Sequence, residues 1–532
     1  MRARLAALLP AAELATGRPA APDIMVTTFH GLGLMILREH HERAGLAAGF
    51  RVADDAARLE VAAELTWSPR DGGRLLAEAA AEPASRELLV KALAARDLVD
   101  FDGLIELSGQ LLAAEPDIAR SLRDRWPLIS VDEYQDIDAA QYRLLRLLAG
   151  DGRGLTVIGD PDQAIYGFRG ADVDLFLRFG RDYPGAVTRQ LTRNYRSGRA
   201  IVAGALQAIA PSSLVPGRVL RAAVDVMPGA RGAQDSRAAP GTPPALADAL
   251  IGFHEGADER AEAAWIAREI ERLLGGASFH ALDTGRAGAQ GHDGLSLSDI
   301  AVLYRTDAQA QPLGQALTRA GLPFQKSSHD LLERRTGVPE IVREMRLADP
   351  GAATVTDRLR RAVRMLAARA EADSAAAAVD VRTAGEVLAP LARRCDNDLE
   401  RFLTEISLGA ETDALDPRAD AVTLLTLHAA KGLEFEVVFL AGCEKDLLPL
   451  WVPGRAPLTG PELAEERRLL FVGITRARAR LYLTCASRRT RHGSTRETGR
   501  SPFLAAIDPA LLDRSGTPAR ASRPAGRQLR LL

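Results

Sequence analysis

The stretch LISVDEYQD, residues 128–136, is the segment that decides the fold. Its first four residues are mainly apolar and predict a buried strand, and Asp132 and Glu133 follow directly at the strand's C-terminal end. Open parallel α/β sheets bind ligands at that edge. Hydrolysis of a nucleoside triphosphate needs such a carboxylate pair, because one acid holds Mg²⁺ and its neighbour orients and deprotonates the attacking water. Since most Asp-Glu pairs are simply solvated, this interpretation depends on the segments around it.

A second stretch, VIGDPDQAIYGFRGA, begins at Val157 and again predicts a strand that ends in polar residues. Gln163 lies in the loop after this strand, and Tyr166 and Phe168 flank a glycine on the following turn, next to Arg169. Aromatic rings beside an arginine are suited to stacking on unpaired bases, which contributes roughly 1–3 kcal/mol per base. The alternative is that both rings belong to the hydrophobic core. Because of the motif around them, we favour the stacking interpretation.

Continuous apolar runs separated by helical segments recur along the chain, which is the pattern of buried parallel strands. Two blocks, 37–125 and 346–415, are instead rich in Ala, Leu, Arg and Glu and predict helices that interrupt this pattern. Residues 211–250 are rich in Pro, Gly and Ala and predict a loop-rich connection. The sequence therefore predicts an α/β fold with two lobes, each carrying a helical insertion. Further strands are expected at 155–158, 300–304, 422–427, 437–440 and 481–484.

The composition is that of an ordinary globular protein of 532 residues, 47% hydrophobic and 26% charged, with a net charge of −2. This length predicts several domains. Three scattered cysteines without metal-ligand spacing fit a reducing compartment, and we expect the protein to be cytoplasmic. No run approaches the roughly 20 apolar residues that span a membrane. Arginines concentrate between Arg467 and Arg530, which is compatible with a phosphate-backbone partner or with a solvated tail.

The stretches at 128–136 and 157–171 resemble motifs of the UvrD/Rep/PcrA-type superfamily 1 DNA helicases. Other segments, in the same order along the chain, resemble further motifs of that family. The resemblance runs from about Ala21 to Leu504, and its specificity comes from the order and plausible spacing of the segments. The segments are Thr27–His30, Asp100–Ile105, Asp132–Asp136, Gly159–Ala171, Leu191–Ser197, Ile300–Arg305, Val422–Phe435 and Glu465–Arg478.

The resemblance implies a role for individual residues. Asp132 would bind Mg²⁺ as the metal ligand and Glu133 would be the catalytic base, while Gln163 would sense the γ-phosphate of ATP. Arg196 and Arg476 would act as arginine fingers that stabilise charge on the transferred phosphate. Glu434 would contact the nucleotide near its ribose or its γ-phosphate. The residues implied to meet single-stranded DNA are Phe29, His30, Tyr166, Phe168, Arg169 and His428.

Some of these residues have structural alternatives. A lone histidine such as His428 is more often a packed or capping residue, although its place after a predicted strand and before AAKG favours the DNA-facing interpretation. Arg467 and Arg468 fit equally well as surface partners of Glu465 and Glu466, so we assign them no role in the site.

The resemblance also implies two RecA-like parallel-sheet lobes, the first of them incomplete. We expect the first lobe at 1–36 and 126–210, with a helical insertion at 37–125. The second lobe with its linker is expected at 211–345 and 416–505, with a reduced helical insertion at 346–415. Residues 506–532 are expected to form a basic flexible tail.

The sequence departs from the family's pattern in three places. The family begins with a Gly-x-x-x-x-Gly-Lys-Thr loop that cradles phosphates, but none of the four lysines here (Lys91, Lys326, Lys431 and Lys445) follows a glycine-rich loop. We therefore expect the chain to start inside the first lobe, with the missing loop encoded upstream of Met1. The block 346–415 is shorter than the usual insertion, and Ala164 stands where the family usually carries Ser.

Two functions of different classes follow from this pattern. The first is an ATP-dependent 3′→5′ DNA helicase or translocase of repair or replication, acting on single-stranded DNA and duplex junctions with ATP and Mg²⁺, and inactive as printed for lack of the phosphate loop. The second is a catalytically dead remnant of a helicase that binds single-stranded DNA or regulates. A fused nuclease is not supported, because no further acidic metal cluster follows Glu465–Arg478.

Overall fold

The computed structural model divides the chain into two compact units. The first comprises residues 1–131, 137–156 and 331–409, and the second comprises 132–136, 157–330 and 410–532. The structure describes residues 24–79, 82–223, 250–275, 295–327, 332, 335–347, 354–408, 419–452, 454–491 and 493–514.

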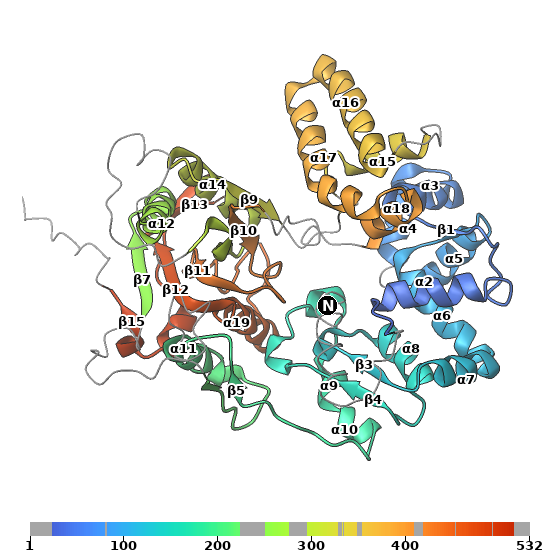
Figure 1. Cartoon of the computed structure of the whole chain (residues 1–532), viewed down its shortest axis with the longest axis horizontal. Coiled ribbons are helices and arrows are strands. Elements are labelled where there is room, and N and C mark those ends of the chain that lie inside the picture. Colours follow the sequence, from blue (N-terminus) through green and yellow to red (C-terminus); the bar gives the residue numbers. More distant parts are fainter. Residues whose placement is uncertain are drawn as a thin grey trace, which may run out of the picture. The chain divides into compact units, whose positions relative to one another are not determined.

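The second unit is built on a seven-stranded sheet in which every described pairing is parallel, in the order β15-β7-β12-β11-β8-β10-β9 (Figure 1). Its inner strand β8, between β11 and β10, consists of five apolar or aromatic residues, all buried, because helices cover both faces of the sheet. The strands are β7 (Ile251–Gly256), β8 (Ile300–Tyr304), β9 (Phe324–Ser327), β10 (Val422–Thr426), β11 (Phe435–Leu440), β12 (Ala477–Ala486) and β15 (Leu512–Asp513).

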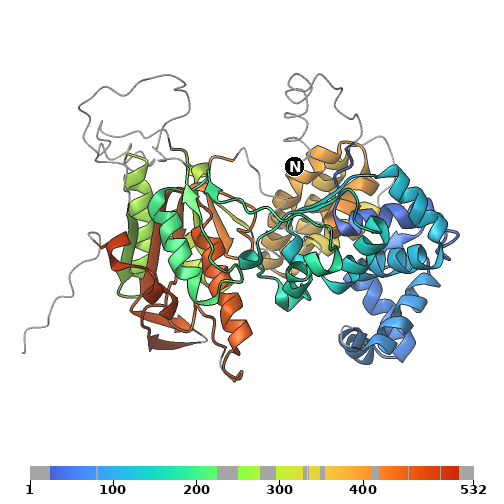
Figure 2. The ribbon, with the colours of Figure 1, turned by 90° about the horizontal axis from the view of Figure 1, so that it is seen from below.

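Two hydrophobic clusters lie on opposite faces of this sheet. Helices α11 (Arg199–Ile209) and α19 (Gly460–Ile474) pack in one cluster, and α12 (Glu259–Leu273) and α14 (Ala310–Arg319) pack in the other. In Figure 2 the sheet is accordingly seen between two helical layers. Of the predicted site residues, His428 follows β10, whereas Glu434 and Arg476 directly precede β11 and β12.

The first unit is mainly helical, and its main core is formed by α2, α6, α7 and α8. Small sheets join β1 to β2 and β3 to β4. The elements before residue 157 are α2 (Phe29–Glu39), β1 (Arg51–Val52), α3 (Asp55–Thr66), α4 (Pro69–Ala79), α5 (Pro83–Ala94), β2 (Leu98–Val99), α6 (Phe101–Ala114), α7 (Pro116–Arg125), β3 (Ile129–Val131), α8 (Ala139–Ala149) and β4 (Leu155–Val157). The same unit contains α15 (Val338–Leu347), α16 (Val355–Asp373), α17 (Ala375–Cys395) and α18 (Leu399–Leu408).

The α/β fold with helical insertions is confirmed, and the predicted strands are found within a few residues of their expected ends. The block 37–125 also contains the short pair β1–β2, which the helical prediction did not include. Helices α16–α18 interrupt the second unit's sheet in the sequence, between β9 and β10, but by their contacts they belong to the first unit. An ion pair between Arg346 and Asp54, with Nη1 and Oδ2 3.3 Å apart, illustrates this grouping.

One boundary was wrong. The predicted flexible tail at 506–532 begins too early, because Leu512–Asp513 forms β15 and pairs with β7. The connection at 211–250 is described up to residue 223 and includes β6 (Arg221–Ala222), which pairs with β5 (Arg193–Asn194); residues 224–249 and the N-terminal residues 1–23 lie outside the described part. Among the described helices, none is long and apolar enough to cross a membrane.

Candidate functional site

The carboxylate pair at the end of β3 sits on a bent backbone. Glu133 has φ of +52°, in the left-handed region that residues other than glycine rarely adopt. The bend is held because Tyr134, fully buried, donates its N–H to the carbonyl of Ile158 at 2.9 Å. Asp132 and Glu133 themselves are exposed. Both carboxylates are therefore presented to solvent by a buried anchor, as a ligand-binding edge requires.

Lys431 connects the carboxylate segment to the strand end of β10. Its ammonium lies 2.5 Å from Asp136 Oδ2 and 3.5 Å from Glu133 Oε2, and it donates to the carbonyl of Gln163 at 2.6 Å. The side chain is only 5% exposed. Burial raises the pKa of Asp136 to about 6, against the opposing effect of Lys431. Sequence reasoning missed this lysine, although its position three residues after His428 in a chain with four lysines was an available signal.

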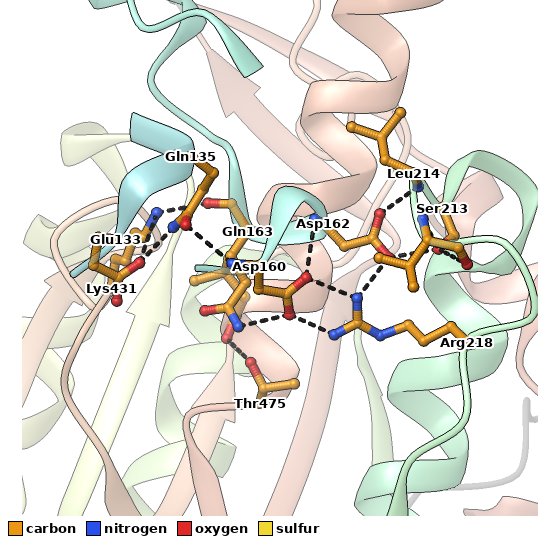
Figure 3. Close-up of polar contacts among 12 residues, drawn as sticks. Glu133, Gln135, Asp160, Asp162, Gln163, Ser213, Leu214, Arg218, Lys431 and Thr475 are labelled. Atoms are coloured by element: carbon orange, nitrogen blue, oxygen red, sulfur yellow. Dashed lines mark hydrogen bonds and ion pairs between the residues drawn. The ribbon is translucent and has the colours of Figure 1, made fainter. Parts of the chain in front are cut away.

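Gln163 is oriented by a short series of hydrogen bonds, drawn in Figure 3. Its side-chain amide donates to Asp160 Oδ2 at 3.0 Å, and its oxygen accepts from Arg476 Nη2 at 3.3 Å. The buried Gln135 donates to Glu133 and accepts from the backbone N–H of Asp160 at 3.0 Å. The predicted base and the predicted γ-phosphate sensor are thus joined through Gln135 and Asp160.

Arg476 is almost fully buried, with 2% of its side chain exposed. It donates to the carbonyls of Val472 at 3.0 Å and Leu433 at 3.2 Å, which fix its direction. Burial, and then the charge of Arg196, lowers the pKa of Arg476 to about 10, so the guanidinium stays charged at neutral pH.

Arg196 and Glu434 form an ion pair beside Arg476, with Nε and Oε2 2.7 Å apart. Arg196 also donates to the carbonyl of Thr475, the residue directly before Arg476, at 3.3 Å. The structure therefore brings together the two predicted arginine fingers and the predicted nucleotide contact.

Arg218 was not expected in the site. Its guanidinium pairs with Asp160 and lies 2.8 Å from Asp162 Oδ2, and Asp162 also accepts from Leu214 N at 2.6 Å and Ser213 Oγ at 2.5 Å (Figure 3). Burial alone would raise the pKa of Asp160, but hydrogen bonds from Arg218 and its charge outweigh burial and lower it. No motif marked Arg218, because it lies in the Pro- and Gly-rich connection.

The aromatic residues form a cluster at the end of β10. The Tyr166 hydroxyl donates to the carbonyl of His428 at 3.2 Å, and the Phe168 and His428 rings meet edge to face with centroids 5.4 Å apart. Arg169 lies over both aromatic rings, 5.9 Å from Tyr166 and 5.6 Å from Phe168. Tyr166 is half-buried against the core, whereas Phe168 is 66% exposed, so the two rings are not both core residues.

Phe29 and His30 belong to the other compact unit. The His30 ring stacks on Phe101 with centroids 3.5 Å apart, and burial lowers its pKa to about 4. The ring is therefore neutral at pH 7 and offers no positive charge to a phosphate.

The arginines left unassigned hold the backbone of this region. Arg468 is buried and donates to the carbonyl of Ala164 at 2.8 Å, and Arg467 donates to the carbonyl of Ala208 at 3.0 Å. Glu466 pairs with Arg305, with Nη2 and Oε1 2.5 Å apart, so the surface pairing with Arg467 or Arg468 that we considered is not the one observed.

The donor set fits a phosphate group accompanied by Mg²⁺. Within the described residues no three His, Cys, Asp or Glu side chains group closely enough to hold a metal by themselves. Mg²⁺ is usually held by one or two carboxylates together with substrate phosphates and water, which matches Asp132 beside Glu133. Arg196 and Arg476 supply the guanidinium groups that phosphate oxygens prefer.

Two family descriptions match the chain. Residues 77–184 match the UvrD/REP helicase N-terminal domain, and residues 189–349 and 353–488 match the UvrD-like helicase C-terminal domain. The second match alone covers more than half of the chain.

Curated proteins are similar over most of the chain. The ATP-dependent DNA helicase UvrD2 of Mycobacterium tuberculosis is 31% identical over 96% of this chain and 73% of its own length. The ATP-dependent DNA helicases PcrA of Leuconostoc citreum and Bacillus subtilis are 29% and 28% identical, over 96% and 93% of this chain and 77% of each relative. Among solved structures, the C-terminal domain of a possible DNA helicase from Lactobacillus is 13% identical and covers 60% of this chain, with a TM-score of 0.25, too low to establish a shared fold.

Proposed function

Because the chain belongs to the UvrD/Rep family of helicases, we propose that it is an ATP-dependent motor that moves 3′→5′ on single-stranded DNA and opens duplex junctions in repair or replication. The observation that carries the proposal is the cluster of Glu133, Gln163, Arg196 and Arg476, which hydrogen bonds link within the second unit. Such a cluster combines a base, a phosphate sensor and two cations around one position.

The nucleotide side of the proposal assigns a role to each residue. Asp132 would hold Mg²⁺, which would neutralise phosphate charge, and Glu133 would accept a proton from the attacking water. Gln163, held by its hydrogen bond to Asp160, would contact the γ-phosphate. The buried guanidinium of Arg476 would contact the same phosphate. Glu434 holds Arg196 in reach of that position. Lys431 keeps the segment from Glu133 to Asp136 against the end of β10.

The residues at the site do not provide the whole phosphate cradle. Three of the four lysines form ion pairs: Lys91 with Glu87, Lys326 with Asp307, and Lys431 with Asp136 beside Glu133. None of the four lysines follows a glycine-rich loop, so nothing in the 532 residues matches the amide nest that holds β-phosphates. This observation favours a second candidate function for the printed polypeptide, a protein that binds single-stranded DNA without hydrolysing ATP.

The DNA side of the proposal places Tyr166, Phe168, Arg169 and His428 against the bases and backbone of a single strand. An exposed ring, a half-buried ring and a guanidinium over both provide a stacking surface that does not select sequence. Binding of this kind needs no nucleotide, and it weakens as salt increases because phosphate contacts release counterions.

The experiment that tests the DNA side is a fluorescence-anisotropy titration of a labelled oligo-dT with the 532-residue chain. We expect Tyr166→Ala combined with Phe168→Ala to weaken binding about ten-fold or more, since each stacked base contributes roughly 1–3 kcal/mol. Trp67→Ala is the matched control, because Trp67 is a 94% exposed aromatic residue of the first unit, outside the cluster. Equal affinities of the double variant and the parent chain would show that these rings do not bind DNA.

A further inference from the structure

The turn that carries Tyr166 and Phe168 begins a short 3-10 helix, Gly167–Arg169, whose first N–H group needs a partner. The residue before it, Tyr166, provides no side-chain cap. The acceptor comes instead from α19, where Glu465 Oε1 accepts the Gly167 N–H at 3.0 Å. The turn therefore depends on a carboxylate nearly 300 residues away in the sequence.

The contact leaves no room for a side chain at position 167 unless the Glu465 carboxylate moves. A Cβ atom there would lie 2.8 Å from Glu465 Oε2 and 3.3 Å from its Cδ, closer than side chains normally approach. Glu465 is half-buried, and burial raises its pKa, while the hydrogen bond from Gly167 acts in the opposite direction. Backbone and carboxylate thus fit each other tightly at the base of the Phe168 ring.

The same face of α19 holds the other end of the turn. Arg468 lies three residues after Glu465, hence on the same side of the helix, and donates to the carbonyl of Ala164 at 2.8 Å. At the C-terminal end of α19, Arg476 donates to Gln163. Helix α19 and Arg476, two residues beyond its end, therefore contact three points of the segment that runs from the predicted phosphate sensor to the stacking rings.

We infer that Glu465 is a positioning residue that sets the geometry of the Tyr166–Phe168 stacking surface through the Gly167 N–H. This rests on the proposed function, because the stacking surface is part of it. Through Glu465, Arg468 and Arg476, a displacement of α19 is transmitted to the DNA-binding rings and to Gln163 together.

The test measures oligo-dT affinity by fluorescence anisotropy with the full chain, without nucleotide and at constant salt. Glu465→Ala is expected to weaken binding about five-fold, the size of effect seen when one ordinary hydrogen bond is removed. Glu465→Gln keeps an acceptor oxygen and is expected to stay within about two-fold of the parent chain. Glu497→Ala removes the same charge from an exposed strand of the same unit, Ser494–Glu497, and is expected to leave affinity unchanged.

Folding should survive Glu465→Ala, because Gly167 is exposed and its N–H can bind water. Gly167→Ala provides a second variant, since its Cβ displaces the Glu465 carboxylate while Glu465 itself remains. It is expected to weaken affinity as Glu465→Ala does, with a melting temperature close to that of the parent chain.

A double-mutant comparison separates positioning from a general structural role. Once Phe168→Ala has removed the exposed ring, adding Glu465→Ala should cause little further loss of affinity. A full additional loss in that background would overturn the inference, and so would parent-like affinity of Glu465→Ala alongside a weakened Phe168→Ala. If instead Tyr166→Ala with Phe168→Ala binds as the parent does, the stacking surface of the proposed function fails, and the inference fails with it.

Discussion

At the scale of single residues, burial changes the chemistry of side chains whose types are evident in the sequence. Arg476 remains charged but is held by backbone carbonyls, whereas His30 is stacked on Phe101 and kept neutral. A histidine in a motif that resembles a DNA-contacting segment would be expected to offer charge to phosphate. In this structure His30 instead packs on Phe101, so its protonation should destabilise the fold.

His30 should make the first unit less stable in acid. Its pKa is about 4 in the folded chain and about 6.5 when unfolded, so the unfolded chain binds the additional proton between these values. The contribution is fully present above pH 6.5 and is lost as the pH falls toward 4. His30→Phe keeps an aromatic ring on Phe101 and cannot be protonated, so its melting temperature should fall less than that of the parent chain between pH 7 and pH 5.

The measurement is a series of thermal melts of both proteins across that range. Other groups, including Asp136, titrate equally in both, so the difference between the two proteins isolates His30. Parallel curves at all pH values would contradict the assignment.

At the scale of elements, the turn after β4 is held by segments that come much later in the chain. The segment from Ser213 to Arg218 directs a hydroxyl, an N–H and a guanidinium at Asp160 and Asp162. Asp162 is fully buried, and the Arg218 guanidinium also lies 5.0 Å from the Phe471 ring of α19. The segment from Ser213 to Arg218 therefore also holds Asp160 and Asp162 in place at the site.

Removing Arg218 should destabilise the second unit. Arg218→Met keeps the length of the side chain and its packing on Phe471 but leaves two buried or half-buried carboxylates without their cation. We expect a loss of about 3 kcal/mol in the free energy of unfolding, the usual cost of breaking a buried ion pair by deleting one partner. Urea unfolding followed by circular dichroism measures it.

The control for this prediction removes one carboxylate as well. Asp162→Asn can still accept from the Leu214 N–H through its single oxygen and can donate its amide to Ser213 Oγ, so the double variant Arg218→Met with Asp162→Asn should recover part of the lost stability. An unchanged unfolding midpoint in Arg218→Met would show that the ion pair contributes nothing net.

At the scale of the whole molecule, the compact units do not follow the order of the chain. Residues 132–136 group with the second unit although β3, directly before them, belongs to the first, and 331–409 return to the first. The proposed catalytic residues, from Glu133 to Arg476, are therefore assembled within one unit from three separate segments of the chain.

The printed 532-residue chain should hydrolyse ATP much more slowly than the turnover of about 1–10³ s⁻¹ typical of enzymes. The reason is that its arginines and acids act at the γ-phosphate, whereas no lysine follows a glycine-rich loop to hold the nucleotide. Steady-state phosphate release with and without oligo-dT tests this, with Glu133→Gln as the control for contaminating activity. DNA-stimulated turnover in that range, abolished by Glu133→Gln, would refute the prediction.

The strands, the helical blocks and the family of this protein were determined by the sequence alone. A strand that is covered on both faces of a sheet, such as Ile300–Tyr304, is apolar at every position. Such a run can be recognised from neighbouring residues in the sequence alone. The motif residues, among them Gln163 and Arg476, were named as candidates because the order and spacing of the segments around them resemble the family's motifs.

Only the tertiary structure decided which partners the site residues contact and which of their side chains are charged. Lys431, Arg218 and Glu465 are ordinary charged residues in sequence, yet each meets a partner between 50 and 300 positions away. Ion pairing, desolvation and ring stacking depend on what surrounds a group in space, and in water the same charges would be solvated separately. The packing of remote segments removes that water, which is why position along the chain did not reveal these contacts.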